Sequence, residues 1–286
     1  MEPQRAIPQT ETVASVAGKI VQAVYSYRFL TAPQLARLFA GDPDAEEQAL
    51  QRLVNAEYLT AVRRPTLDPH TPNIVYALAQ RGANLVADRL GIDRRHVRWR
   101  KYHNLVGLSL LEHRLATNDV RIALKLGAPR VGGRLEYWWY EFPLRENIDD
   151  PDEHVPPLVL RPDAYAQCKA GVRSLHLFVE VDLATESNRR FGGKVRRYLA
   201  YKESTLFRVR MGGRSFRVLI IVPGPARLRA LKRVVEDQGG ARMFWLALQS
   251  DVIEGKITKP IWRLAGEDEP ASLFSVPAEQ SSADAA

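Results

Sequence analysis

Two nearly continuous apolar runs in the second half of the chain constrain its fold more than any other feature. The first, "LHLFVEVD", covers residues 175–182, and the second, "FRVLIIV", covers residues 216–222. A strand is apolar along its whole length when both faces of its sheet are covered. A basic helical segment, residues 187–204, separates the two runs. The order helix, strands, helix, strand, helix, strand in residues 105–265 therefore predicts an α/β unit around a central mixed sheet.

The chain carries more positive than negative charge. Its 286 residues include 41 Lys and Arg against 33 Asp and Glu, so the formal net charge is +8 at pH 7. A basic sum favours polyanionic partners such as nucleic acid. The single Cys168 excludes an internal disulfide framework and a cysteine-ligated zinc site. We find no secretory signal and no apolar run of about 18 residues, and therefore expect a cytoplasmic protein without membrane contact.

Residues 13–90 carry the pattern of short helices followed by a β-hairpin. Apolar residues recur at helical spacing in "VAGKIVQAVYSYRFL", "TAPQLARLF" and "DAEEQALQRLVNAEYL". Two β-rich pieces then flank the turn "PHTPN", and "LAQRGANLV" leads into another helix. This order resembles a winged helix-turn-helix, in which "ALQRLVNAEYL" is similar to the recognition helix. The resemblance implies that this helix enters the major groove of DNA and that the hairpin contacts the backbone.

Candidate DNA-contacting residues follow from this resemblance and from the distribution of cations. The outward positions of the third helix are Gln48, Gln51, Arg52 and Asn55, and the hairpin supplies Arg63 and Arg64. The basic, aromatic-containing stretch 91–104 adds Arg94, Arg95, Arg98, Arg100 and Lys101 as phosphate contacts. The basic helix between the apolar runs adds Arg189, Arg190, Arg196 and Arg197, together with Lys194. Acidic residues at the start of the third helix repel phosphate, which leaves a protein-contact role open.

Carboxylates follow two neighbouring predicted strands. Asp163 comes after an apolar segment in "LRPDAYA", and Glu180 and Asp182 end the first apolar run. Because they are two residues apart on a strand, Glu180 and Asp182 share one face. Metal-dependent cleavage of a phosphodiester needs oxygen ligands that converge from adjacent strands. The structural alternative is that Asp163 and Glu180 cap strand ends or pair with nearby arginines.

The spacing of these carboxylates resembles the PD-(D/E)xK nuclease core. The resemblance implies that Asp163 and Glu180 are Mg²⁺ ligands. Asp182 holds the position that the motif gives to its catalytic lysine, so the pattern is incomplete. Lys194 is the candidate substitute, and Glu112, on the preceding helix, is the candidate extra carboxylate. The hypotheses are a Mg²⁺-dependent nuclease or nickase, with all five of these residues in its site, or a degenerate nuclease-like unit without a cofactor.

Several segments, taken in order, make the chain resemble the replication-relaxation family of plasmid and mobile-element proteins. They are the winged helix, "LATNDVRIAL", "LRPDAYA", "FVEVDLATES", "KVRRYLAY" and "RVLIIV". The resemblance implies a role in replication or relaxation of DNA, with double-stranded DNA as the main partner. It supplies a context more than a mechanism, since the activity of the family is poorly defined.

The expected fold class is α+β or α/β, with a winged helix-turn-helix followed by a restriction-endonuclease-like mixed sheet. The predicted parts are disordered residues 1–12, a winged helix at 13–90, a basic linker at 91–104, a nuclease-like unit at 105–265 and a disordered acidic tail at 266–286. A non-catalytic scaffold for replication or conjugation proteins stays open as a further alternative. A homodimer also stays open, since winged helices often pair.

Overall fold

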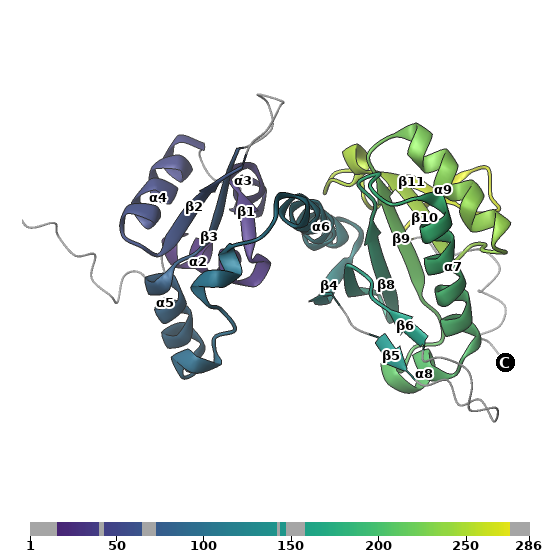
Figure 1. Ribbon diagram of the computed structural model, residues 1–286, viewed down its shortest axis with the longest axis horizontal. Coiled ribbons are helices and arrows are strands. Elements are labelled where there is room, and N and C mark those ends of the chain that lie inside the picture. Colours follow the sequence, from purple (N-terminus) through teal and green to yellow (C-terminus); the bar gives the residue numbers. More distant parts are fainter. Residues whose placement is uncertain (1–15, 40–42, 65–72, 142–143, 147–157, 275–286) are drawn as a thin grey trace, which may run out of the picture. The chain divides into compact units, whose positions relative to one another are not determined.

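The computed structural model describes residues 16–39, 43–64, 73–141, 144–146 and 158–274 (Figure 1). The chain divides into two compact units, of which the first ends at Asn118 and the second begins at Asp119. Helix α6 (Leu108–Gly127) crosses this boundary and contributes to both units. The boundary therefore lies inside a helix, whereas the sequence analysis placed it in the basic stretch 91–104.

The first unit combines helices with a three-stranded sheet. Its helices are α2 (Val16–Tyr27), α3 (Ala32–Phe39), α4 (Pro43–Asn55) and α5 (Gln80–Leu90). Its strands are β1 (Phe29–Thr31), β2 (Leu59–Arg63) and β3 (Ile74–Leu78), ordered β1–β3–β2 with antiparallel neighbours. The order of α3, α4 and the β2–β3 pair is that of a winged helix-turn-helix, and the predicted fold class is confirmed.

The first half of α6 completes the core of the first unit. Its Leu111 and Leu115 are buried against Phe29 of β1 and against β3. Gln34 of α3 donates from Nε2 to the Leu115 carbonyl at 2.9 Å. Asn118 donates from Nδ2 to the Phe29 carbonyl at 2.6 Å. These contacts explain why the structural boundary falls after residue 118.

The basic stretch 91–104 packs on the first unit. It contains two short 3₁₀ helices, η1 (Arg94–His96) and η2 (Lys101–Asn104). Val97 is fully buried and Trp99 is 8% exposed. The Trp99 Nε1 donates to Asn104 Oδ1 at 3.1 Å, and Asn104 Nδ2 donates to the Leu78 carbonyl at 2.9 Å. The stretch is therefore a folded extension of the winged helix, and its interpretation as a linker is corrected.

The second unit is built on a seven-stranded mixed sheet. In order across the sheet, the strands are β12 (Pro270–Ser272), β11 (Pro260–Leu264), β10 (Phe244–Leu248), β9 (Arg217–Val222), β8 (Arg173–Val181), β7 (Ala164–Ala170) and β4 (Gly133–Tyr140). Strands β8, β9 and β10 are mutually parallel, and the other neighbours are antiparallel. Strands β5 (Leu144–Glu146) and β6 (Leu158–Leu160) form a separate pair. The predicted central mixed sheet is confirmed.

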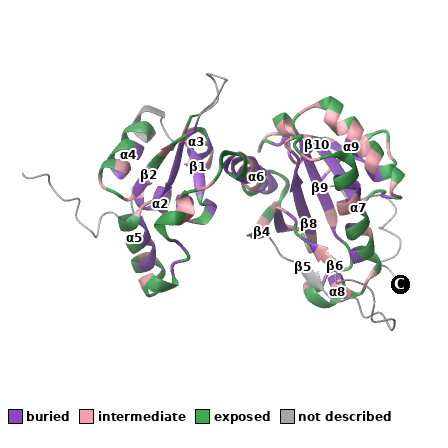
Figure 2. Ribbon diagram, viewed as in Figure 1, coloured by how far each residue is buried: buried purple, intermediate pink, exposed green. Residues whose placement is uncertain are grey.

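Helices cover the central strands of this sheet. Figure 1 shows α7 (Asn188–Glu203) and α9 (Pro225–Asp237) side by side on one face, and α8 (Leu206–Met211) follows α7. Phe191 and Tyr198 of α7 and Leu231 of α9 belong to the same buried cluster as Phe178 and Ile220 of the strands. Figure 2 shows this burial along β8, β9 and β10. Both apolar runs of the sequence are therefore central strands.

The predicted terminal segments differ in outcome. Residues 1–12 and 275–286 lie outside the described residues. Residues 266–274 are part of the fold, because β12 pairs with β11 and Leu273 is fully buried. The predicted disordered tail therefore begins too early by these nine positions. Among the described residues, every helix is too short or too polar to cross a membrane.

Candidate functional site

Asp163 and Glu180 lie beside each other at one end of strands β7 and β8. Asp163 directly precedes β7, and its backbone N–H donates to the Val179 carbonyl at 3.0 Å. The Val181 N–H donates to Asp163 Oδ2 at 2.7 Å. These two bonds bracket Glu180 on the neighbouring strand. The antiparallel pairing of β7 and β8 thus brings together two carboxylates that are 17 positions apart in the chain.

Two side chains of α7 hold the Glu180 carboxylate. The Tyr198 hydroxyl donates to Oε1 at 2.7 Å, and the Lys194 ammonium donates to Oε2 at 2.9 Å. Residues four apart on a helix project from the same face, so one helix can supply both donors. Ser187 caps the start of α7, where its Oγ accepts from the Arg190 N–H at 3.3 Å. The ammonium that the nuclease hypothesis requires is therefore in contact with Glu180.

Burial dominates the electrostatics of this cluster. Glu180 is 3% exposed, and burial together with the nearby Asp163 charge raises its pKa to about 7, against the opposing effect of Lys194 and Tyr198. Burial also lowers the pKa of Lys194, but its contacts with Glu180, Asp163 and Glu186 outweigh that effect and raise it. Burial and Glu180 raise the pKa of Tyr198 well above its ordinary value. At neutral pH the cluster thus holds a charged ammonium, a neutral phenol and a carboxyl that can exchange its proton.

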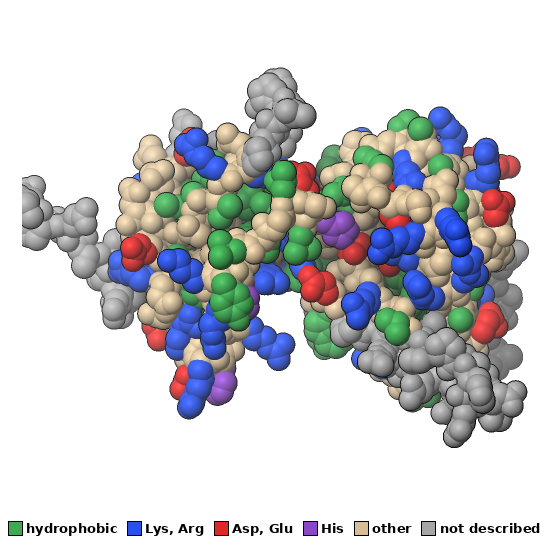
Figure 3. Space-filling model, in the orientation of Figure 1, with side chains coloured by type: hydrophobic (Ala, Val, Ile, Leu, Met, Phe, Trp, Pro, Cys, Tyr) green, Lys and Arg blue, Asp and Glu red, His purple; other side chains and the backbone are tan. Residues whose placement is uncertain are grey.

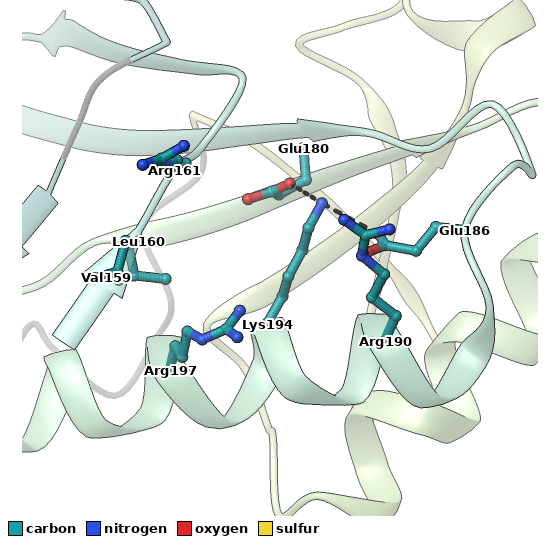
Figure 4. Close-up of a pocket in the computed structure, with 8 residues that line it drawn as sticks. All are labelled: Val159, Leu160, Arg161, Glu180, Glu186, Arg190, Lys194 and Arg197. Atoms are coloured by element: carbon teal, nitrogen blue, oxygen red, sulfur yellow. Dashed lines mark hydrogen bonds and ion pairs between the residues drawn. The ribbon is translucent and has the colours of Figure 1, made fainter. Parts of the chain in front are cut away.

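Cations surround this cluster in a pocket of about 300 Å³ (Figure 4). Lys194 bridges Glu180 and Glu186, and its Nζ lies 3.1 Å from Glu186 Oε2. Arg190 pairs with the same Glu186 at 3.3 Å. Arg161 and Arg197 complete the cationic lining, so four cations meet two carboxylates in this pocket. Such an excess of guanidinium and ammonium groups suits an anionic ligand, and guanidinium groups match phosphate oxygens in particular.

Asp182 has a different environment from Glu180. The Arg227 guanidinium of α9 donates from Nε to Asp182 Oδ1 at 2.9 Å and from Nη2 to Oδ2 at 2.7 Å. The same Nη2 donates to the Glu186 carbonyl at 2.6 Å. Asp182 does not line the pocket around Glu180. Its observed contacts fix the loop that leads into α7.

Glu112 belongs to the first unit, where the structure pairs it with Arg64. The Arg64 Nη1 lies 2.5 Å from Glu112 Oε1, and the Arg64 side chain is 7% exposed. This pair joins the end of the hairpin strand to α6. This ion pair joins a predicted catalytic residue, Glu112, to a predicted DNA-binding residue, Arg64. Neither residue lines the cationic pocket around Glu180.

The remaining predicted DNA contacts of the first unit are exposed with one exception. The exposed positions are Gln48, Gln51, Arg52 and Asn55 of α4, Arg63 of β2, and Arg95, Arg98, Arg100 and Lys101. Arg94 is half-buried, with its guanidinium over the Trp99 ring at 5.5 Å. On α4, Gln51 donates to Asn55 Oδ1 at 2.8 Å, and Arg52 donates to the Gln48 carbonyl at 3.3 Å. The outward face of α4 therefore presents amide and guanidinium groups, which can bond to base edges.

The predicted cations of the second unit lie on α7. Arg189, Arg190, Arg196 and Arg197 are exposed. Arg196 also donates to Gln238 Oε1 at 2.6 Å, just past the end of α9. Figure 3 shows Lys and Arg side chains gathered over the part of this unit where α7 and α9 lie. Helix α7 therefore carries these arginines, and its residues Arg190, Lys194 and Arg197 line the Glu180 pocket.

Sequence reasoning missed two contributors to the Glu180 cluster, Tyr198 and Glu186, and the partner of Asp182, Arg227. Tyr198 follows Lys194 by four positions, so its place on the same helical face was readable once Lys194 was assigned. Glu186 directly precedes the Ser187 cap of α7, outside the periodic part of the helix, so no helical pattern indicates the direction of its side chain. Arg227 is 45 positions from Asp182, and no local pattern signals that pairing.

Asp163 and Glu180 could serve as ligands of Mg²⁺ if water and substrate phosphates supplied its other ligands. Mg²⁺ in proteins commonly takes one or two carboxylates and fills its other positions with water and substrate phosphates. Each carboxylate oxygen has two acceptor sites, so the bonds from Lys194 and Tyr198 leave acceptor capacity on Glu180. The described residues contain no group of three or more His, Cys, Asp or Glu arranged for a metal. Asp163 and Glu180 would be the protein ligands, and the cation would offset phosphate charge.

Comparison with known proteins identifies one family. A model of the family described as replication-relaxation matches residues 21–214, which is more than half of the chain. The match spans the winged helix, α6 and the strands and helix that carry Asp163, Glu180 and Lys194. No curated protein matches the chain.

Solved structures give only distant likenesses. RV1404 from Mycobacterium tuberculosis is 20% identical, with a TM-score of 0.25, over 35% of this chain and 66% of that one. A fdxN element excision controlling factor from Anabaena variabilis is 10% identical, with a TM-score of 0.31, over 52% and 98%. Restriction endonuclease FokI is 11% identical, with a TM-score of 0.32, over 87% of this chain. The chain spans less than half of the FokI chain, at 44%.

Proposed function

The chain belongs to the replication-relaxation family, and we propose that it binds double-stranded DNA in the replication, relaxation or transfer of a plasmid or other mobile element. In this proposal α4 reads base edges in the major groove. The pocket around Glu180 and the arginines of α7 bind backbone phosphates. Family membership and the basic charge of the chain support this assignment.

One observation carries the proposal: four cations surround a pocket next to an exposed basic helix face. Arg161, Arg190, Lys194 and Arg197 line the pocket, and Arg189 and Arg196 continue the charge along α7. Arginine donates several N–H groups in a fixed plane, so it can hold two phosphate oxygens at once. A chain of such sites can follow a DNA backbone without reading its sequence.

Salt-dependent binding tests this proposal. We expect fluorescence anisotropy with a labelled duplex to show binding that weakens as salt rises, since each neutralised phosphate contributes about 0.9 to the slope of log K against log salt. The double variant Arg190→Gln with Arg197→Gln should lower that slope by about 1 to 2. Arg208→Gln is the matched control, because Arg208 is exposed on α8 and does not line the pocket.

Two results would count against the proposal. One is the absence of duplex binding at low salt. The other is a slope that stays the same in the double variant and in the wild type. A second pair of variants addresses α4: Arg52→Gln and Asn55→Ala should weaken binding to a preferred sequence more than binding to random duplex.

A second candidate function is Mg²⁺-dependent cleavage of DNA. The observation that favours it is the contact between Lys194 and Glu180 beside Asp163, in a setting that raises the pKa of Glu180 to about 7. Perturbed carboxyl groups in a pocket occur often at catalytic sites. Here Asp163 and Glu180 would hold the cation, and Lys194 would stabilise charge on the phosphate.

Supercoiled plasmid distinguishes binding from cleavage. Cleavage predicts nicking that requires Mg²⁺ or Mn²⁺, is lost in Asp163→Asn and Glu180→Gln, and falls by at least about a hundredfold in Lys194→Met, the scale seen when one transition-state donor is removed. A role confined to binding predicts a shifted plasmid without nicks, unchanged by the metal. Asp182→Asn serves as a further comparison, because Asp182 bonds to Arg227 outside the pocket.

A further inference from the structure

A second cavity lies at the opposite end of the same parallel strands. The Glu180 pocket lies at the carboxyl end of β8, whereas Arg173 begins β8 and Arg217 begins the parallel neighbour β9. A cavity of about 580 Å³ opens beside those first residues and reaches Trp245 of β10. Its size is within the range of roughly 300–1,000 Å³ that small-molecule sites occupy. The two cavities share no lining residue.

The charge of this cavity is positive. Arg173, Lys202, Arg217 and Arg242 contribute to its lining. Among the described residues that line it, none is Asp or Glu. Arg242 pairs at 2.8 Å with Glu267, which is not part of the lining. An anion is therefore the ligand that this lining favours.

Arg217 is the most constrained of these cations. Its guanidinium lies over the Trp245 ring, 4.2 Å from the ring centroid, and it donates to the Leu273 carbonyl. Burial lowers the pKa of Arg217 to about 10, and the charge of Arg173 adds to this effect. Both causes disfavour the charged guanidinium, and a bound anion would oppose both. The stacking and the carbonyl bond fix the position of this cation before any ligand arrives.

The rest of the lining is mostly apolar and partly aromatic. Its larger apolar members are Leu175, Leu199, Phe216, Met243, Trp245 and Leu264, and the polar residues Ser174, His176 and Ser215 stand among them. Phe216 is 6% exposed and Trp245 is 4% exposed, so these rings form the base of the cavity and not a loose surface. Apolar side chains of this kind line most small-molecule sites. The cavity thus combines a cationic side with an apolar side.

We propose that this cavity binds a phosphorylated nucleoside, with Arg173, Lys202 and Arg217 on the phosphate and the apolar wall against the base. The site goes beyond the proposed DNA-binding function, because it uses none of the residues assigned to it. Two sources share this chemistry: a free nucleotide, and the 5′-phosphorylated end of a DNA strand. Inorganic phosphate alone would bind more weakly, since it cannot use the apolar wall.

Calorimetric titration of the full-length protein tests the proposal. The ligands are dAMP, inorganic phosphate, and a single-stranded tetranucleotide with and without its 5′-phosphate. We expect dAMP or the phosphorylated tetranucleotide to bind at least tenfold more tightly than inorganic phosphate. A preference for one of the two identifies the source. Removal of the 5′-phosphate should abolish the tetranucleotide signal.

Variants assign the binding to this cavity. Arg217→Gln and Lys202→Gln should each weaken it about tenfold or more. Lys202 is exposed and its ion pair with Glu203 is long, at 3.9 Å, so Lys202→Gln keeps the test valid if Arg217→Gln does not fold. Lys194→Gln, in the other pocket, should leave it unchanged. The inference is overturned if none of these ligands binds at millimolar concentration, or if Lys194→Gln removes binding while Lys202→Gln does not.

Discussion

At the scale of single residues, the Asp182–Arg227 ion pair joins the residue that follows β8 to α9. Its side chains are 3% and 15% exposed, and two parallel hydrogen bonds join them. Loss of one partner leaves the other charge buried, which typically costs about 3–5 kcal/mol. We therefore predict that Arg227→Met lowers the free energy of unfolding by that amount in urea denaturation.

Arg229→Met is the control for this prediction. Arg229 is exposed on the same helix, so its loss should change stability by no more than about 0.5 kcal/mol. Equal effects of the two substitutions would show that the pair contributes nothing beyond helix composition. Arg227→Lys should recover only part of the loss, since an ammonium cannot form the two parallel bonds.

Glu180 should make stability depend on pH. Its pKa is about 7 in the folded protein against an ordinary value of 4.5, so the folded state holds the proton more tightly than the unfolded chain. The stabilisation is complete below about pH 4.5 and is lost as pH rises through 7. Because one pKa unit corresponds to about 1.4 kcal/mol, we predict a decline of at most about 3 kcal/mol between pH 5 and 8. Glu180→Gln should lack this decline, and parallel curves for the two proteins would contradict the prediction.

Local patterns revealed some of the site residues and hid others. Asp163 and Glu180 stood out because they interrupt apolar strands, and Lys194 because it lies within the next helix. The contacts of Asp182 and Arg64 could not be read from sequence, since their partners are 45 and 48 positions away. Long-range ion pairs leave no periodic signal, whereas strand and helix faces do.

At the scale of elements, two helical glycines should respond in opposite ways to the same substitution. A Cβ at Gly82 of α5 would lie 2.1 Å from the Tyr58 carbonyl oxygen, so Gly82→Ala must displace the helix. We predict a loss of about 1–3 kcal/mol in unfolding free energy. A Cβ at Gly193 of α7 meets nothing closer than 3.8 Å, so Gly193→Ala should stabilise by about 0.5–1 kcal/mol.

Thermal denaturation of the two variants checks this contrast. The melting temperature should fall for Gly82→Ala and rise for Gly193→Ala. If both melting temperatures rise, helix propensity alone would account for the result. Such an outcome would show that the close approach of Gly82 to the Tyr58 carbonyl oxygen does not limit the stability of the first unit.

The succession of elements was predictable, and their packing was less so. The two apolar runs became β8 and β9 because nearly continuous apolar segments suit strands covered on both faces. The stretch 91–104 was misread because its arginines dominate the composition. Val97 and Trp99 alone carry the signal of burial there, and two residues give no recognisable period.

At the scale of the whole molecule, both units should contribute to binding of one duplex. Arg52 lies on α4 of the first unit and Arg197 on α7 of the second. We predict that Arg52→Gln and Arg197→Gln each weaken binding to a long duplex, and that the double variant shows the sum of their free-energy changes, because substitutions without shared partners act independently. Anisotropy titrations of the three variants measure this. A silent Arg197→Gln would restrict DNA contact to the winged helix.

Helix α6 has a consequence for how this protein can be taken apart. It passes from the first unit to the second without a break, with Asn118 and Asp119 both inside it. A protease needs an extended strand of several residues in its cleft, and a packed helix offers none. Limited digestion should therefore release no fragment that ends near residue 118, although two compact units are present. For the same reason, a truncated gene that ends between the two units would cut through helix α6, which contributes residues to both units.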